Sequence, residues 1–247
     1  SGIMNCDCSE DFKFKEVKEL SKKIGGGVTI NDLMSSAITC SLKKLFKENG
    51  DKNESVQIVV PASVRFEFYP KREDVKLENK FSAIPVNLPL CDSMEEAYPK
   101  IKKASSKLKN NFFNFLMTYG TYAFTFYSNS LAPRSISRRV IDKVSPSFTM
   151  GFSNLPGPIK PLYYENSDKS VKYYALASHT YIVVSGFVGV GIICMSFCDS
   201  FKLAITSDDS ILSKADNKKV IKYIEDFIRE EKIRLKDQPI PEDKKTK

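Results

Sequence analysis

The sequence predicts a mixed α/β fold (an α/β or α+β arrangement), and three observations support this prediction. Short runs of β-branched and aromatic residues alternate with stretches whose apolar residues recur at helical spacing. Glycine and proline stand at the boundaries between these runs. Long stretches of chain separate the predicted strands, and no internal repeat is visible. We therefore expect a mixed sheet flanked by helices.

The composition is that of an ordinary globular protein. The chain has 247 residues, which suffices for one large domain or two small ones. Hydrophobic residues make up 42% and charged residues 28%, which excludes collagen, a coiled coil and wholesale disorder. The one histidine, His179, lies within apolar strand sequence, where a structural role is commoner than a catalytic one. The six cysteines include no CxxC pair, so we expect free thiols and no metal site.

The first helices are predicted by local signals. Lys15 to Ile24 reads as an amphipathic helix that Gly25-Gly26-Gly27 ends. Thr29 is a good N-cap for a second helix that runs to about Lys47, and Asp32, three residues later, completes a capping box.

Strands and two further helices account for most of the remaining chain. One of these helices is capped by Ser93, has Glu96 at its fourth position and leads into a basic, aromatic segment. We expect strands at 12–14, 56–64, 81–90, 147–153, 171–177, 181–184, 191–198 and 202–206. The apolar run 56–64 suggests burial on both faces, and the uncharged run 173–198 suggests two buried strands with a turn between them. A helix is expected at 216–231, so that residues 1–233 form the domain and 234–247 a polar, frayed tail.

The excess positive charge is confined to one segment. Between Glu96 and Asp142 there are eight lysines and arginines and no acidic residue, whereas the rest of the chain balances at 30 against 30. The same segment holds nine of the 28 aromatic residues. It reads as a buried helix with a lysine-rich solvated lead-in, or as a segment that meets an anionic membrane surface. Nucleic acid is a weaker alternative, and the many asparagines and threonines disfavour a transmembrane span.

No catalytic constellation is evident from the residues alone. The patterns GxSxG, HExxH and the Walker loop are absent. The glycines 186, 189 and 191 suggest a close approach of strands, not a dinucleotide turn. Asp208-Asp209 suits a metal or acid site, or a helix N-cap and first turn, and we favour the helix role.

Four short motifs, in order, resemble those of the bifunctional wax ester synthase/diacylglycerol acyltransferases. Val28-Thr29-Ile30-Asn31-Asp32 resembles their T-V-N-D segment, and Val60-Pro61-Ala62-Ser63-Val64-Arg65 their V-P-V-S-V-R strand. The third motif resembles G-N-x-x-S-x-x-x-V-x-L-P and consists of Asn79-Lys80-Phe81-Ser82-Ala83 followed by Val86-Asn87-Leu88-Pro89. Glu78 stands where the family motif has its glycine. Ser153-Asn154-Leu155-Pro156-Gly157-Pro158 closely matches S-N-V-P-G-P.

The resemblance implies one lobe of a two-lobed fold. It covers the C-terminal half of that family, whose members share the fold of the CoA-dependent, chloramphenicol acetyltransferase-like enzymes. Their catalytic histidine acts as a general base and lies in an HHxxxDG motif on the N-terminal lobe. That motif does not occur in this sequence, and His179 does not match it. We therefore assign no catalytic residue to this chain.

The resemblance also implies two groups of site residues. The substrate-channel or family-motif group is Asn31, Asp32, Ser63, Arg65, Asn79, Ser153, Asn154, Pro156 and Gly157. Asp32 has its capping role as well. The acyl-tunnel or membrane-facing group is Phe112, Phe115, Tyr119, Tyr122, Phe126, Arg134, Arg138 and Arg139.

The function expected from the resemblance is that of an O-acyltransferase lobe. The substrates would be acyl-CoA as cosubstrate and a fatty alcohol or diacylglycerol as acceptor, with no bound cofactor. The expected partners are an HHxxxDG-bearing lobe, from the same gene or another chain, and an anionic membrane surface, with no nucleic acid. The first residue is Ser and not Met, so we expect a processed chain, a tagged chain or a piece of a longer product, and the longer product is the first hypothesis.

Two further expectations concern place and activity. No signal peptide is visible, so we expect an intracellular protein, on the cytosolic face of the endoplasmic reticulum or a lipid droplet or within an organelle assembly. The alternative function is a catalytically inactive, acyltransferase-like structural or accessory subunit of a larger assembly.

Overall fold

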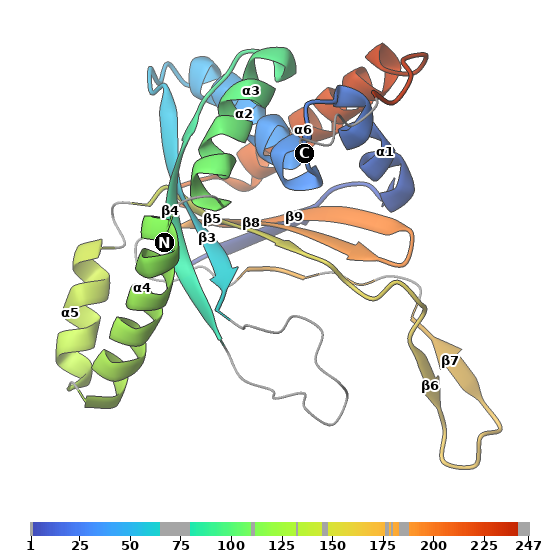
Figure 1. Ribbon diagram of the computed structural model, residues 1–247. Helices are drawn as coiled ribbons and strands as arrows, with labels where there is room; N and C mark the ends of the chain where they lie inside the picture. The colour runs from blue at the N-terminus through green and yellow to red at the C-terminus, as the bar shows by residue number, and fades with distance from the viewer. Residues whose placement is uncertain are drawn as a thin grey trace.

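A mixed sheet forms the centre of the protein, with helices on one face (Figure 1). The computed structural model describes residues 2–64, 80–109, 112–131, 133–144, 148–175, 178, 180–182 and 188–241. In these residues the strand order is β1-β9-β8-β5-β3-β4, with the short β2 also beside β9. The strands of this sheet are β1 (Met4–Cys8), β2 (Phe12–Lys13), β3 (Ser55–Ser63), β4 (Phe81–Pro89), β5 (Met150–Leu155), β8 (Val190–Phe197) and β9 (Ser200–Asp208).

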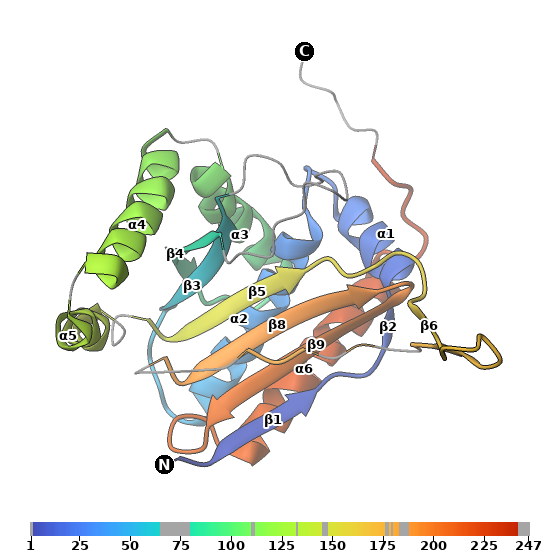
Figure 2. The same cartoon turned by 90° about the horizontal axis from the view of Figure 1, so that it is seen from below.

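The strand directions bring three carboxyl ends together. β3, β5 and β8 run parallel to one another, whereas β1, β2 and β4 pair antiparallel with their neighbours and β8 pairs antiparallel with β9. The last residues of β3 and β5 therefore lie at the same edge of the sheet (Figure 2).

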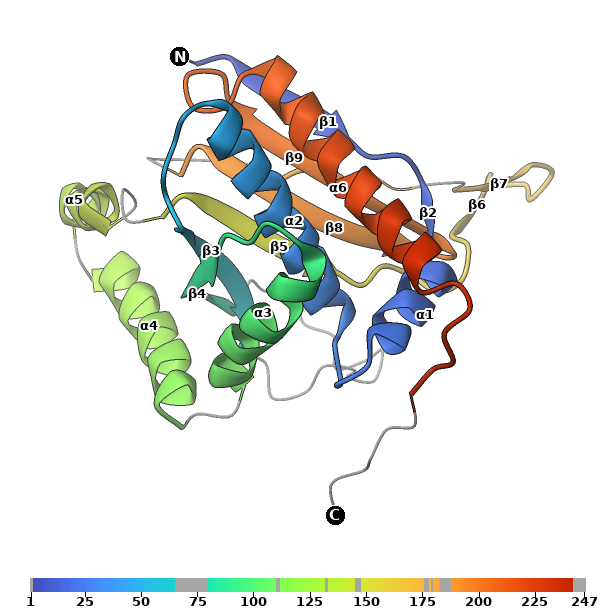
Figure 3. The ribbon, with the colours of Figure 1, turned by 90° about the horizontal axis from the view of Figure 1, so that it is seen from above.

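Two long helices cover one face of the sheet. α2 (Ile30–Glu48) and α6 (Lys214–Arg234) lie across the strands, with α1 (Phe14–Ile24) and α3 (Met94–Lys109) beside them (Figure 3). α2 is buried along most of its length because it packs against both α3 and α6. The largest fully buried side chains come from these helices and the central strands: Leu33, Met34, Ile38, Leu45, Ile58, Ile101, Met150, Ile192, Phe201, Leu203, Ile205 and Ile224.

A returning segment of chain contacts the opposite face of the sheet. Met195 on β8 accepts hydrogen bonds at its sulfur from Thr180 Oγ1, at 2.9 Å, and from Ser178 Oγ, at 3.8 Å. β8 is accordingly buried along nearly its whole length.

Two hairpins extend beyond the sheet, away from α2 and α6 (Figure 1). One is helical and consists of α4 (Phe112–Leu131), which packs beside β4, and α5 (Arg134–Val144). The other consists of β6 (Tyr163–Glu165) and β7 (Lys172–Tyr174), which among the described strands form a separate two-stranded sheet.

Several predictions about local structure are confirmed. Gly25, Gly26 and Gly27 all have positive φ angles and separate α1 from α2. Thr29 and Asp32 form the predicted capping box. β4, which contains Pro85 and Pro89, lies at the edge of the sheet, where the missing amide donors of proline are tolerated.

Other predictions are wrong. β3 is not buried on both faces: its exposed and buried residues alternate, because helices cover one side only. The stretch predicted as a buried strand at 171–177 forms the exposed β7, because it pairs with β6 and not with the sheet. Tyr181 and Ile182 are not in a strand, and residues 183 and 184 lie outside the described part. β1, β6 and α5 were not predicted, and α6 extends to Arg234, with Leu235 buried.

Candidate functional site

The first turn of α2 is held by a closed set of hydrogen bonds. Asp32 is 2% exposed. Its Oδ2 accepts from the Thr29 amide at 2.9 Å and from Thr29 Oγ1 at 2.8 Å, while Thr29 Oγ1 accepts from the Asp32 amide at 3.3 Å. These bonds satisfy amide groups that a helix N-terminus otherwise leaves unpaired.

Asp32 also joins α2 to α3. Ser105 on α3 donates from Oγ to Asp32 Oδ1 at 2.7 Å. The carboxylate is thus bonded through both oxygens, and its structural role exceeds simple capping. The Lys102 ammonium, one turn earlier on α3, lies over the glycine loop, 3.1 Å from where a Cβ on Gly27 would stand.

The neighbouring residue Asn31 faces outward and contacts β5. Asn154 Nδ2 donates to Asn31 Oδ1 at 2.5 Å. Asn31 is exposed, and Asn154 is the residue before the end of β5. The structure therefore joins the first and last of the four motif segments.

The turn after β5 packs closely on the end of β8. The Gly157 amide donates to Ser196 Oγ at 3.1 Å, and a Cβ on Gly157 would lie 1.8 Å from the Ser196 carbonyl oxygen. Gly157 does not have a positive φ angle, so backbone conformation is not what requires a glycine at this position. The turn needs glycine because the two backbones approach closely.

We call this region the motif edge, defined as Asn31, Asp32, Ser63, Ser153, Asn154, Pro156 and Gly157. Ser63 belongs to it because it ends β3, which runs parallel to β5. Ser153 is buried, whereas Ser63 and Pro156 are exposed. Arg65 and Asn79, which were predicted with this group, lie outside the described residues, as does His179.

The aromatic and basic group lies elsewhere, on α4 and α5. Tyr119 and Tyr122 are half-buried, whereas Phe126 is 55% exposed, so α4 is not the fully buried helix of the first interpretation. Arg134, Arg138 and Arg139 are exposed on α5. Phe112 and Phe115 are in α4, but their side chains lie outside the described part. The structure thus separates the two predicted groups.

Asp208 and Asp209 have structural partners. Asp208 Oδ1 accepts from the Ser210 amide at 2.9 Å, and Asp209 Oδ1 accepts from Asn5 Nδ2 at 2.8 Å. The residue that caps α6 is Ser213, so the expected helix-capping role of this aspartate pair is wrong. Within the described residues, no group of three or more histidine, cysteine, aspartate or glutamate side chains is arranged to hold a metal ion.

Sequence reasoning missed the contribution of Ser105. The sequence predicts a lysine-rich, solvated lead-in to a buried helix in this part of the chain. However, Ser105 follows Tyr98 and Ile101 at helical spacing, and both of these are buried. That spacing was the available signal that Ser105 faces the core side.

The comparisons with known proteins bear on the fold and the family. The family model "WS/DGAT C-terminal domain" matches residues 77–231. Comparison with curated protein sequences found no match. None of the described helices is long and apolar enough to cross a membrane.

The chain resembles many solved structures, and the following three are among them. The wax ester synthase/diacylglycerol acyltransferase from Marinobacter aquaeolei VT8 has a TM-score of 0.61 at 14% identity, over 94% of this chain and 49% of that chain. TRI3 trichothecene 15-O-acetyltransferase from Fusarium sporotrichioides has a TM-score of 0.57 at 17% identity, over 92% of this chain and 46% of that chain. The epimerization domain TycB3(E) of tyrocidine synthetase B has a TM-score of 0.51 at 13% identity, over 94% of this chain and 47% of that chain.

These similarities confirm the predicted fold class, one lobe of the two-lobed, chloramphenicol acetyltransferase-like fold. At such low identities they show the fold alone. The chain spans about half the length of each of these neighbours.

Proposed function

The chain belongs to the WS/DGAT C-terminal domain family, and from that premise we propose that it is the C-terminal lobe of an O-acyltransferase of lipid metabolism. The reaction would transfer a long-chain acyl group from acyl-CoA to a fatty alcohol or a diacylglycerol. The proposed place is the cytosolic face of a membrane, the endoplasmic reticulum or a lipid droplet, where such acceptors partition.

The hydrogen bond between Asn31 and Asn154 carries the proposal. It holds an exposed amide at the carboxyl ends of parallel strands, which is where open α/β sheets bind their ligands. Asn31 Oδ1 already accepts a hydrogen bond from Asn154 Nδ2, whereas none of the described residues accepts a hydrogen bond from Asn31 Nδ2. That nitrogen is therefore placed to donate to an oxygen of the substrate or of a facing lobe.

The chemistry divides between two lobes. A general base takes the proton of the acceptor hydroxyl, the oxygen attacks the thioester carbonyl, and the CoA thiolate leaves and takes up a proton. The HHxxxDG motif that would supply this base is absent from the 247 residues. We therefore assign the base to an N-terminal lobe. We assign the Asn31 amide and the walls of the substrate channel to the lobe that the present chain forms.

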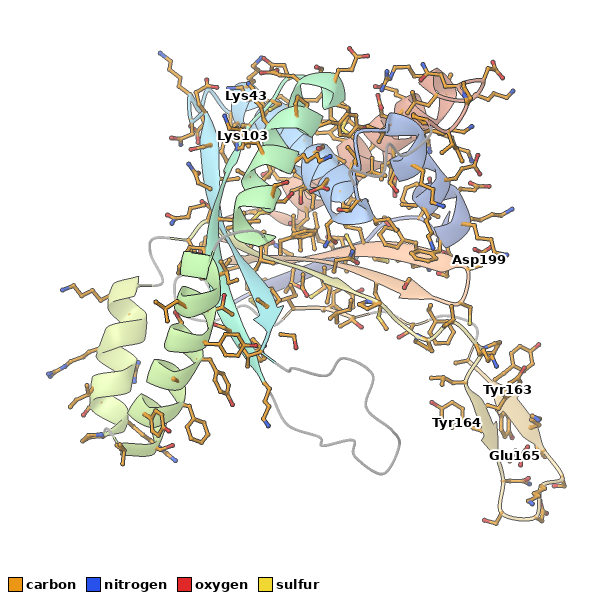
Figure 4. The ribbon with its side chains drawn as sticks, in the orientation of Figure 1. Lys43, Lys103, Tyr163, Tyr164, Glu165 and Asp199 are labelled. Atoms are coloured by element: carbon orange, nitrogen blue, oxygen red, sulfur yellow. The ribbon has the colours of Figure 1, made fainter. Side chains whose placement is uncertain are left out.

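A second candidate function is an inactive accessory subunit, and the β6–β7 hairpin favours an assembly role. Its four tyrosines, at positions 163, 164, 173 and 174, are each about 60% exposed. Tyr163 and Tyr164 point to opposite sides of the hairpin (Figure 4). A two-stranded hairpin is marginally stable by itself, and tyrosine is enriched in protein interfaces. We infer that another part of the assembly covers this hairpin.

An acyl-transfer assay separates the two functions. The native protein would be isolated from its source with an antibody against this chain, then incubated with radiolabelled palmitoyl-CoA and either hexadecanol or diacylglycerol. We expect ester formation by the native protein and only background formation by recombinant 1–247. Ester formation by 1–247 alone would contradict the assignment of the base. No ester formation by the native protein would favour the accessory subunit.

A further inference from the structure

The α4–α5 hairpin presents an uncovered apolar surface at its turn. Phe126, Tyr127, Leu131 and Ile136 are exposed by 55%, 61%, 82% and 51%. The Phe126 ring contacts those of Tyr122 and Tyr127, with centroid separations of 6.2 and 5.6 Å respectively, so these aromatic residues form one chain of contacts. Several large apolar side chains exposed on one short helical hairpin are typical of a binding surface.

The same turn carries positive charge. Arg134, Arg138 and Arg139 are exposed on α5, and the twenty residues of α4 include no charged side chain. Asp142 is the one acidic residue of α5, and its Oδ2 lies 3.9 Å from Arg138 Nε. We call this surface the basic-aromatic tip and define it as Phe126, Tyr127, Leu131, Arg134, Ile136, Arg138 and Arg139.

The combination of groups identifies the class of partner. An anionic bilayer offers phosphates to the arginines and an apolar interior to Phe126, Leu131 and Ile136. Nucleic acid also offers phosphates, and its bases stack on aromatic rings. It has no apolar interior, however, in which aliphatic side chains as exposed as Leu131 and Ile136 would be buried together. Charge complementarity together with aliphatic exposure therefore favours the lipid surface.

We propose that the basic-aromatic tip is an interfacial anchor that binds anionic lipid bilayers. The apolar side chains of the tip enter the headgroup region, and the three arginines lie among the lipid phosphates. The anchor involves α4 and α5 and none of the residues of the motif edge. It therefore does not depend on the proposed acyl transfer.

Vesicle flotation tests the charge dependence. Recombinant 1–247 would be mixed with phosphatidylcholine vesicles, with or without roughly 30% phosphatidylserine, at about 50 and about 300 mM salt. We expect binding to the anionic vesicles at least about tenfold tighter than to the neutral ones, and weaker at high salt. Equal binding to both, or no binding, would overturn the proposal.

Matched charge variants locate the surface. Arg134→Gln/Arg138→Gln/Arg139→Gln should weaken binding to anionic vesicles by about 100-fold, since each basic residue near an anionic surface contributes about fivefold. The control Lys214→Gln/Lys218→Gln/Lys222→Gln removes the same charge from exposed positions on α6 and should bind within about threefold of the unchanged chain. Equal losses in the two triple variants would contradict a specific anchor. Circular dichroism would verify that both remain folded.

A fluorescence reporter tests insertion. The chain contains no tryptophan, so Leu131→Trp introduces a single fluorophore at the tip, and Ile233→Trp introduces one at a position 75% exposed on α6. Anionic vesicles should shift the emission of the tip reporter to the blue and leave that of the α6 reporter unchanged. Equal responses of the two reporters would overturn the proposal.

Two further results would also overturn it. One is that the chain binds a single-stranded oligonucleotide more tightly than vesicles and that the triple arginine variant loses this binding. That result would indicate that the partner of the tip is nucleic acid. The other is vesicle binding by 1–247 but not by the native protein, which would show that another part of the protein covers the tip.

Discussion

Asn154 on β5 donates a hydrogen bond to Asn31 on α2, and this bond joins residues 123 positions apart in the sequence. It connects the edge of the sheet to the first turn of the central helix. Both side chains lie at the surface, so the bond contributes little to the free energy of folding. Its consequence is positional, because it fixes the orientation of the Asn31 amide.

Substitution of either asparagine should therefore affect activity more than stability. We expect Asn31→Ala or Asn154→Ala to lower the free energy of unfolding by at most about 1 kcal/mol. In the native protein, the proposed acyl transfer predicts that the same changes reduce ester formation by about tenfold or more, because they release a positioned group. Asn53→Ala, at an exposed asparagine before β3, is the control and should change neither quantity. Full activity in both site variants would contradict the role given to the motif edge.

The hydrogen bond from Ser105 to Asp32 should be a measurable link between α3 and α2. Ser105→Ala removes a donor to a buried carboxylate, so we expect a loss of about 1.5 kcal/mol in urea unfolding. Ser106→Ala, the same change one position further along α3, should cost less than about 0.5 kcal/mol. A double-mutant cycle with Asp32→Asn should give a coupling energy of about 1 kcal/mol. Additive effects would show that the two residues do not interact.

Two glycine-to-alanine substitutions should have opposite effects. Gly157→Ala places a Cβ against the Ser196 carbonyl, so we expect a loss of about 2 kcal/mol or more. Gly120→Ala is in α4, where a Cβ would meet nothing within 4 Å, so it should stabilise the protein by about 1 kcal/mol through helix propensity. Thermal unfolding would measure both. Unchanged stability of Gly157→Ala would show that the turn does not approach β8 as described.

The cysteines should react in two classes. Burial raises the pKa of Cys40 to about 12 and raises the pKa of Cys91 and Cys194 above the ordinary thiol value. A raised pKa means that the reactive thiolate forms only at higher pH, so these three thiols should resist iodoacetamide at about pH 8. Cys6 and Cys8 are exposed and should be labelled first, and Cys198 is half-buried. Peptide mapping before and after denaturation checks this, and prompt labelling of native Cys40 would contradict the packing of α2.

The sequence predicted those parts of the fold that local signals determine. Thr29 and Asp32 act within one helical turn, and this proximity makes a capping box recognisable in sequence. The apolar runs of β3 and β8 were likewise found as strands. By contrast, β1 pairs with β9 about 200 residues away, and no local pattern announces that pairing. The exposure of β7 depends on which strand it pairs with, and this is a property of the tertiary structure.

The candidate site was predicted as a set of residues but not as an arrangement. The resemblance to known motifs singled out Asn31 and Asn154, but only the structure shows that their side chains touch. It also separates the motif edge from the aromatic and basic residues of α4 and α5. Ser105 could have been found from its helical spacing to Ile101, whereas its bond to Asp32 could not, because that bond depends on how α3 packs on α2.

Mass spectrometry of the native protein, immunopurified from its source, tests the central claim most directly. The account predicts that peptides of this chain are accompanied, in equal amounts, by a peptide containing HHxxxDG. That peptide would belong either to the same polypeptide or to a tightly bound second chain. A native protein with neither the motif nor a partner that carries it would contradict the assignment of this chain as one lobe of an acyltransferase.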